Sequence, residues 1–206
     1  MTLLRPQWEA LRKVWDNGYR DEVRRSAIAF VLLYFIAFAG SLALPELRGA
    51  VMARVAELFG SLGVTGDTGG LSALLLFSNN IQACAMMMLY GLIPFIHLTA
   101  LPLGMNAMLL GVLLGHYAAT GMSIPLYLAS LIPHAIFELP ALILAIGMGL
   151  FVCGQLTRRC RHDETALPLR ECFVNMSRVL LLVLPLLLAA AVTEAYITPL
   201  VASLFQ

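Results

Sequence analysis

The stretch from Ile124 to Cys153 is long and apolar enough to cross a lipid bilayer, and it contains one carboxyl group and one imidazole, those of Glu138 and His134. A charged side chain at the centre of a bilayer costs about 2.5–3.5 kcal/mol on insertion scales, so such residues normally face a protein partner or a water-filled cavity. Residues four apart on a helix share one face. We therefore expect His134 and Glu138 to project together into the protein and to mark its functional site.

The composition is that of an integral membrane protein. Hydrophobic residues make up 60% of the chain and charged residues 12%, whereas soluble domains carry ~25% charged residues. The four cysteines form no C-x-x-C pair, and we expect them to be reduced. We expect no cofactor and no nucleic acid partner.

Hydropathy predicts an all-α fold, a polytopic transmembrane helical bundle with about five spans in a single integral membrane domain over residues 1–206. Each span needs about 20 mostly apolar residues. The predicted spans cover residues 26–44, 71–95, 101–119, 124–153 and 178–202. We expect the first to be a retained span and not a cleaved signal peptide. Residues 91–104 are compatible with either a tight hairpin or a re-entrant turn.

The basic residues predict the orientation of these spans. Five spans place eleven of the thirteen Lys and Arg residues, in the N-terminal segment and in the segment around residues 158–178, on one side. Arg48 and Arg54 fall on the other side. Since basic loops stay in the cytoplasm, we predict a multi-pass protein of the cytoplasmic (inner) membrane of a bacterium, with its N-terminus in and its C-terminus out.

Two further segments are predicted to form amphipathic interfacial helices, one at the N-terminus and one in the first outer loop. In the first, apolar residues recur at helical spacing between charged ones: Trp8, Leu11, Trp15 and Tyr19. In the second, a comparable stripe follows Pro45: Leu47, Val51, Val55, Leu58, Phe59 and Leu62. Both could anchor the protein in the membrane or dock a partner.

Other polar residues are expected at the depth of the His134–Glu138 pair. Glu194 and His134 lie at similar depths below the outer ends of their spans, with Glu138 one turn deeper, and Asn79 and Asn80 complete this layer. Asn106 lies nearer the cytoplasmic side, where we expect it to form an interhelical hydrogen bond. Small residues that let helices approach closely follow on two spans: Ala141, Ala145 and Gly149, and Gly111 and Gly115.

Three interpretations of the polar layer stay open. The side chains could satisfy one another and specify the bundle. They could handle protons or a solute, as ionisable groups within spans often do. A metal site is the third, with His134, Glu138 and Glu194 as candidate ligands, although H-x-x-x-E alone is a common spacing and assigns no metal. We predict no catalytic residue, since no serine lies in a nucleophile-elbow pattern.

Residues 131–150, with the pattern P-H-x-x-F-E-L-P-A, resemble the signature helix of the stage II sporulation protein M family. The resemblance extends to Phe77-Ser-Asn-Asn80, to Gly104-Met-Asn106 and to the stretch from Ala191 to Pro199. It implies a polytopic scaffold, because in spore formers the namesake recruits a peptidoglycan-degrading machine to the septal membrane during engulfment without being an enzyme. The namesake branch lacks a clear H-x-x-x-E helix, so this chain looks closer to the broader bacterial and archaeal group.

Two hypotheses of function follow. In the first, a non-enzymatic membrane protein positions partner proteins through its outer amphipathic helix, the 45–70 loop and its inner basic segments. In the second, a channel- or transporter-like protein uses His134, Glu138 and Glu194 to line a cavity open to the outside. The expected partners are membrane lipid and the proteins of a membrane complex, and the small-residue stripes also allow a homodimer.

Overall fold

The computed structural model describes residues 4–61 and 73–205, and these residues form helices joined by short connections, with no strand among them. The predicted all-α fold is confirmed. Along the chain the elements are α1 (Leu4–Val14), the kink η1 (Trp15–Tyr19), α2 (Arg20–Ala43), α3 (Pro45–Ser61), α4 (Ala73–Tyr90), α5 (Ala100–Thr120), α6 (Ile124–Cys160), α7 (Leu169–Val192), the π-helical turn η2 (Thr193–Ile197) and α8 (Thr198–Ser203).

Five helical stretches in the described part of the chain are long and apolar enough to cross a membrane, as predicted. They are Gln7–Ala43, Ala73–Tyr90, Ala100–Thr120, Ile124–Cys160 and Leu169–Ser203. Their outward faces carry large apolar side chains, among them Phe35 and Ile36 on α2, Met105 on α5 and Leu181 on α7. Such faces suit contact with lipid chains, so the protein is a multi-pass membrane protein.

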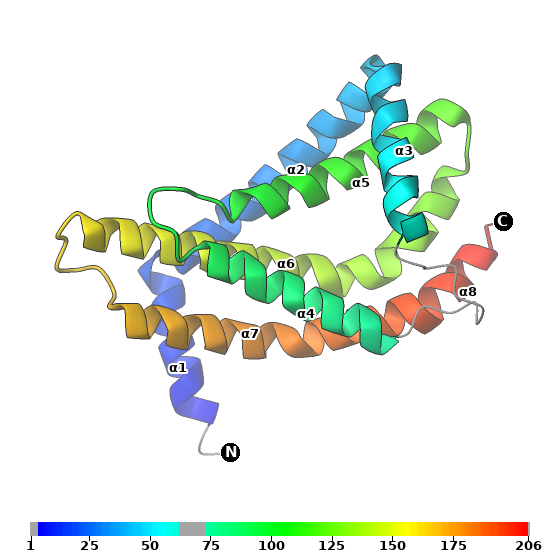
Figure 1. Ribbon diagram of the computed structural model, residues 1–206. Coiled ribbons are helices and arrows are strands. Elements are labelled where there is room, and N and C mark those ends of the chain that lie inside the picture. Colours follow the sequence, from blue (N-terminus) through cyan, green and yellow to red (C-terminus); the bar gives the residue numbers. More distant parts are fainter. Residues whose placement is uncertain (1–3, 62–72, 206) are drawn as a thin grey trace.

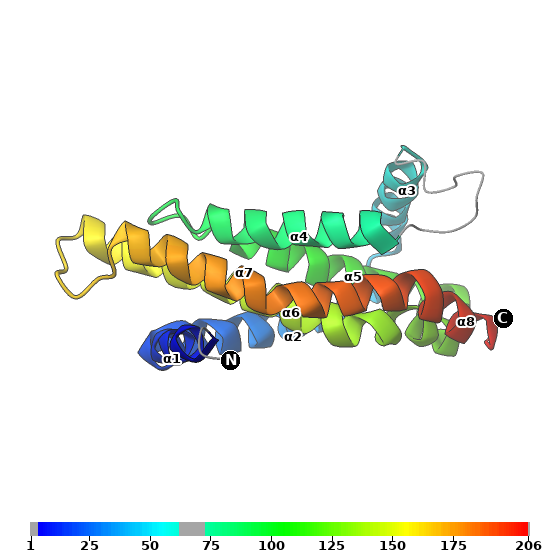
Figure 2. The same ribbon diagram turned by 90° about the horizontal axis from the view of Figure 1, so that it is seen from below.

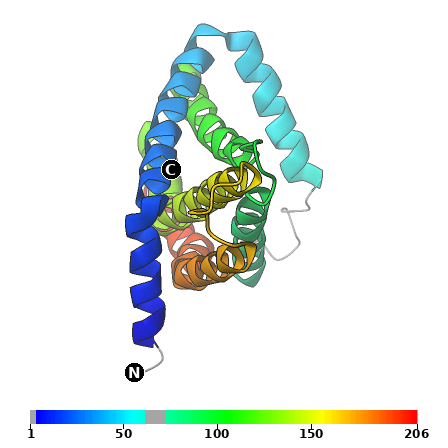
Figure 3. The ribbon, with the colours of Figure 1, turned by 90° about the vertical axis from the view of Figure 1, so that its left-hand side faces the viewer.

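Helix α6 occupies the centre of the bundle. Viewed along the bundle, α2, α5, α4 and α7 surround it (Figure 3). It is the most buried of the five membrane-crossing stretches. Its sequence explains this position, because Ala141, Ala145 and Gly149 recur at helical spacing and are fully buried or nearly so.

The ends of the helices alternate between two sides of the bundle. Helix α1 and the connections 91–99 and 161–168 lie at one end, and the 121–123 turn and the C-terminal α8 lie at the other (Figure 1). The first end, which we call the basic end, carries both segments rich in arginine. This alternation is what five crossings require, and N-terminus in with C-terminus out remains a prediction.

Helix α5 packs closely along α2 through two glycines. A Cβ atom added to Gly111 would lie 2.9 Å from the Cβ of Ala37, and one added to Gly115 would lie 3.0 Å from the Cβ of Ser41. A Cβ atom on Gly111 would also clash with the backbone oxygen of Tyr34, and one on Gly115 would displace the Ser41 side chain, so glycines allow the two helices to approach closely.

The N-terminal helix lies across the bundle and not along it. In Figure 1, α1 crosses α7 near the basic end. The chain bends at η1, where Gly18 adopts a φ of +105°, a left-handed conformation that glycine tolerates. The Tyr19 hydroxyl then donates to the carbonyl of Leu144 on α6 at 2.8 Å, and Arg178 donates to Gln7 at 2.8 Å. The predicted interfacial helix is therefore attached to both α6 and α7.

Helix α3 is the second predicted interfacial helix. Figure 2 shows it standing off from the bundle beyond the end of α2. Arg48 near its start donates to the carbonyl of Ser41 at 2.8 Å, which fixes the corner between α2 and α3. Leu47 is exposed on its surface. The later part of the predicted outer segment, from residue 62 to residue 70, lies outside the described residues.

The connection between α4 and α5 passes over α6. Here Phe95 N–H donates to Thr157 Oγ1 at 2.8 Å, and Thr99 Oγ1 donates to the carbonyl of Met87 at 3.1 Å. Helix α4 packs against α6 and α7, whereas α5 packs against α2. The connection therefore joins two helices that pack mainly on different neighbours.

Several helices begin or end at other residues than the predicted spans. Helix α4 ends at Tyr90, before the predicted end of the second span at residue 95, and the predicted start at residue 71 lies outside the described residues. Helix α6 continues beyond residue 153 to Cys160, and α7 begins at Leu169 instead of residue 178. The reason is that hydropathy marks the apolar part of a helix, whereas Arg158 and Arg170 can continue the helix and extend their charged ends to the membrane surface.

Candidate functional site

The candidate site is built from α6 and the C-terminal helical segment. His134 and Glu138 lie on α6, between the two prolines Pro133 and Pro140 within that helix. Proline lacks an N–H and cannot donate to the carbonyl four residues earlier, so the backbone on this part of α6 is less completely bonded. Glu194 lies in η2, which continues α7 toward α8.

Three predicted site residues come together in the structure. One nitrogen of His134 and one carboxylate oxygen from each of Glu138 and Glu194 all lie within 4.8 Å of one another. His134 Nε2 is 4.0 Å from Glu138 Oε2, and the two side chains are 12% and 25% exposed. This separation is too long for a hydrogen bond, so the pair forms a loose contact and leaves room between the groups.

Helical spacing explains how Glu194 reaches α6. The buried face of α7 passes through Val183, Leu187 and Ala191, and steps of three or four residues carry the same face to Glu194 and Thr198. Between them η2 forms a π-helical turn, a feature often found at functional sites because it changes the direction of side chains within a helix. Periodicity therefore predicts the direction of Glu194, but the π-helical turn has no sequence signature that we recognised.

Thr198 is a site residue that the sequence reasoning missed. Its hydroxyl lies 3.3 Å from Nδ1 of His134, and the side chain is buried. It stands four residues after Glu194, so the same-face rule that grouped His134 with Glu138 could have found it. The site thus contains an imidazole, two carboxylates and a hydroxyl, drawn from α6, η2 and α8.

Of the two asparagines predicted in this layer, Asn79 points away from it. Asn79 is exposed and Asn80 half-buried on α4, and no hydrogen bond between described residues links either of them to the cluster. The reason is rotation, since α4 turns Phe77, Ile81 and Cys84 toward the core and thereby points Asn79 away.

Asn106 also differs from the prediction. Its amide donates to the carbonyl of Pro102 in its own helix at 2.8 Å, and not to another helix. An asparagine within a helix can reach the carbonyl one turn earlier, which satisfies its donor without a partner helix.

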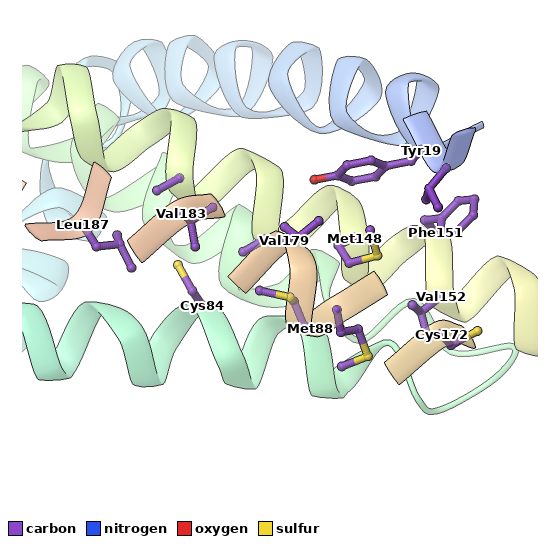
Figure 4. Packing of buried hydrophobic residues seen from close by; sticks show 14 residues of the cluster. Tyr19, Cys84, Met88, Met148, Phe151, Val152, Cys172, Val179, Val183 and Leu187 are labelled. Carbon is purple, nitrogen blue, oxygen red and sulfur yellow. The ribbon is translucent and has the colours of Figure 1, made fainter. Parts of the chain in front are cut away.

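An apolar core separates the cluster from the basic end. On α6, Ala141, Ala145, Met148 and Val152 are fully buried, and they pack with side chains of α4 and α7, among them Cys84, Met88, Val179, Val183 and Leu187. Figure 4 shows Met148 and Val152 of α6 among side chains of α4 and α7. At 1.5 Å per residue, the stretch from residue 141 to residue 152 spans roughly 17 Å. The polar cluster is therefore confined to the end of the bundle opposite the basic end.

The arrangement can hold a positively charged species. Two carboxylates and an imidazole that face one small space can accept a proton or bind a metal cation, and His134, Glu138 and Glu194 are the residues that would do so.

Comparison with known proteins gives the family. The model of stage II sporulation protein M matches residues 26–199, which is most of the chain and includes every residue of the cluster. The chain belongs to the stage II sporulation protein M family. An uncharacterized protein of Methanocaldococcus jannaschii is 30% identical over 128 residues, which is 62% of this chain and 71% of that relative. No solved structure matches the chain. The resemblance drawn from the sequence is confirmed.

Proposed function

We propose that this protein is a non-enzymatic membrane scaffold that positions partner proteins at the cytoplasmic membrane, with the basic end of the bundle in the cytoplasm. The observation that carries the proposal is a groove of about 500 Å³ between α1 and α7 at that end. Its polar lining consists of Lys13, Asn17, Arg170, Glu171, Asn175 and Arg178. Three cationic groups face one anionic group, so the groove suits an acidic segment of a partner protein.

The attachment of α1 supports this role. The Gln7–Arg178 hydrogen bond and the Tyr19–Leu144 hydrogen bond hold α1 against the bundle. The walls of the groove are therefore in place before a partner binds, and a preorganised surface loses less entropy on binding. The apolar core of α4, α6 and α7 also supports a scaffold over a transporter. Its described side chains are apolar, so they offer no polar route between these helices from the cluster to the basic end.

A photo-crosslinking amino acid at Val174 tests the proposal, because this residue lines the groove. The matched control is the same substitution at Leu188, an exposed apolar residue on the same helix. We expect a discrete protein adduct from position 174 alone, and we expect Arg170→Glu to abolish it. Adducts with lipid only would rule out an acidic partner in the groove. So would the same protein adduct from both positions, if it also forms in the Arg170→Glu variant.

A channel- or transporter-like function is a second candidate, favoured by the half-buried carboxylates within the membrane-crossing helices. Purified protein in liposomes should then conduct an ion or proton, and Glu138→Gln and Glu194→Gln should abolish the flux. If wild-type liposomes show no flux, this candidate is excluded.

A further inference from the structure

A bound cation could stabilise the imidazole and the two carboxylates at the end opposite the basic end, because no Lys or Arg among the described residues forms a salt bridge with them. The salt bridges among the described residues pair Glu138 with His134 alone, at 4.0 Å, and include none to Glu194. In a medium of low polarity, two carboxylates this close to each other repel one another unless one of them takes up a proton or a cation lies between them.

We propose that His134, Glu138 and Glu194 bind one divalent first-row transition-metal ion of the Zn²⁺ type, and that this ion joins α6 to η2. The proposal goes beyond the scaffold function and is independent of it. One imidazole and two carboxylates form a ligand set of the kind that zinc and its neighbours accept, with bonds of about 2.0–2.2 Å.

The spacing of the groups fits such an ion after a small adjustment. Tetrahedral bonds of that length place ligand atoms roughly 3.4 Å apart, and the three groups here lie within 4.8 Å of one another. Rotation about the last torsion of each glutamate, which has a broad energy minimum, moves the carboxylate oxygens by this amount. Two of the ligands stand four residues apart on one helix, the spacing that also brings paired histidines to zinc.

Thr198 would orient the imidazole. With Nδ1–H donating to Thr198 Oγ1, 3.3 Å away, the lone pair of Nε2 is directed toward the space beside Glu138. A hydrogen bond to the second ring nitrogen is the usual way in which proteins fix a metal-binding histidine. Thr198 is thus a positioning residue. Because it lies on α8, its hydrogen bond to His134 also links α8 to α6.

The remaining coordination position would be open to water. All three ligand side chains are half-buried and not sealed in the core, so the ion can enter from the membrane surface at this end of the bundle. A site with three protein ligands commonly keeps a water as its fourth.

The first experiment uses the wild-type protein and needs no variant. Detergent-purified protein is stripped with chelator and titrated with Co²⁺, whose visible absorption distinguishes tetrahedral coordination by protein from the hydrated ion. We expect intense d–d bands that saturate at one equivalent and disappear on addition of Zn²⁺. A spectrum that stays that of the hydrated ion would overturn the proposal.

The second experiment assigns the ligands by calorimetric Zn²⁺ titration of folded protein, checked by size-exclusion chromatography. We expect at least 100-fold weaker binding in His134→Ala and in Glu194→Gln, and ~10–100-fold weaker binding in Thr198→Val, as for other residues that orient a ligand. The exposed carboxylate control Glu46→Gln should bind as the wild type does. Unchanged affinity in both ligand variants would also refute this site.

Discussion

The backbones of Gly91 and Gly149 are in direct contact, because a Cβ atom placed on Gly91 would lie 2.7 Å from the carbonyl carbon of Gly149. A Cβ placed on Gly149 would in turn lie 2.5 Å from the carbonyl oxygen of Met87 and 2.7 Å from Thr99 Cγ2. The end of α4 and the start of the 91–99 connection therefore rest directly on the backbone of α6. This contact allows the connection to cross the central helix.

Gly149→Ala is expected to destabilise the fold by about 1–3 kcal/mol, the usual cost of overpacking a tight contact. Gly154→Ala on the same helix is the matched control, since a Cβ there meets nothing within 4 Å, and alanine is up to ~1 kcal/mol better than glycine in a helix. Unfolding in mixed detergent micelles with SDS measures both. Equal stability of the two variants would show that α6 and the 91–99 connection are not in contact.

Tyr19→Phe is expected to cost about 1 kcal/mol, the net contribution of a typical hydrogen bond, because its hydroxyl donates to the Leu144 carbonyl at 2.8 Å. Since η1 links α1 to the bundle, we also expect faster amide hydrogen exchange in α1. Tyr196→Phe, at a tyrosine 65% exposed, should change neither quantity. An α1 that exchanges equally fast in wild type and Tyr19→Phe would mean that Tyr19 does not anchor it.

The sequence predicts how deep in the membrane a polar side chain lies better than it predicts which way the side chain points around the helix axis. Span boundaries placed His134 and Glu194 at one depth, and the structure brings both together with Glu138. The same depth argument included Asn79, which α4 turns away from the cluster because its core face is set by Phe77, Ile81 and Cys84. Rotation of a helix about its axis depends on what packs against it, and hydropathy averaged over a span does not contain this information.

Local exceptions to helical geometry were not predicted either. At the kink η1, Asn17 and Gly18 leave helical geometry, and Tyr19 directly after them bonds to Leu144 on α6, a contact that the local sequence does not reveal. The close approach of Gly91 to Gly149 could not be predicted from either residue. Small residues at helical spacing indicate that another segment packs closely there, but they do not indicate which segment. The small-residue spacing on α6 did predict which face points inward.

Asp163 is expected to order the 161–168 connection over a wide pH range. Hydrogen bonds from the Thr165 hydroxyl at 2.6 Å, from Arg158 Nε at 2.8 Å and from the Thr165 N–H lower the pKa of this carboxyl to about 2. Because the folded pKa lies below the unfolded value, the stabilisation is nearly complete above pH ~5 and is lost as the pH falls through about 2.

Asp163→Asn should therefore speed amide exchange of residues 161–168 to the same extent at pH 5 and at pH 8, after correction for the intrinsic rate. Glu164→Gln, at the adjacent acidic residue, is the control and should leave the exchange unchanged. An effect of Asp163→Asn at pH 8 that vanishes at pH 5 would mean that the carboxyl is protonated at pH 5, so that its pKa is raised and not lowered by these donors.

Cys160 can test the predicted orientation, because it is exposed at the basic end whereas Cys84, Cys153 and Cys172 are buried. If basic segments remain in the cytoplasm, a membrane-impermeant maleimide should label wild-type protein in inverted membrane vesicles and not in intact spheroplasts. In a Cys160→Ser background, Ser203→Cys places a thiol at an exposed position of the opposite end and should show the reverse pattern. Labelling of Cys160 from outside intact cells would place the N-terminus outside, and with it the groove between α1 and α7, so that an acidic cytoplasmic partner could not reach it.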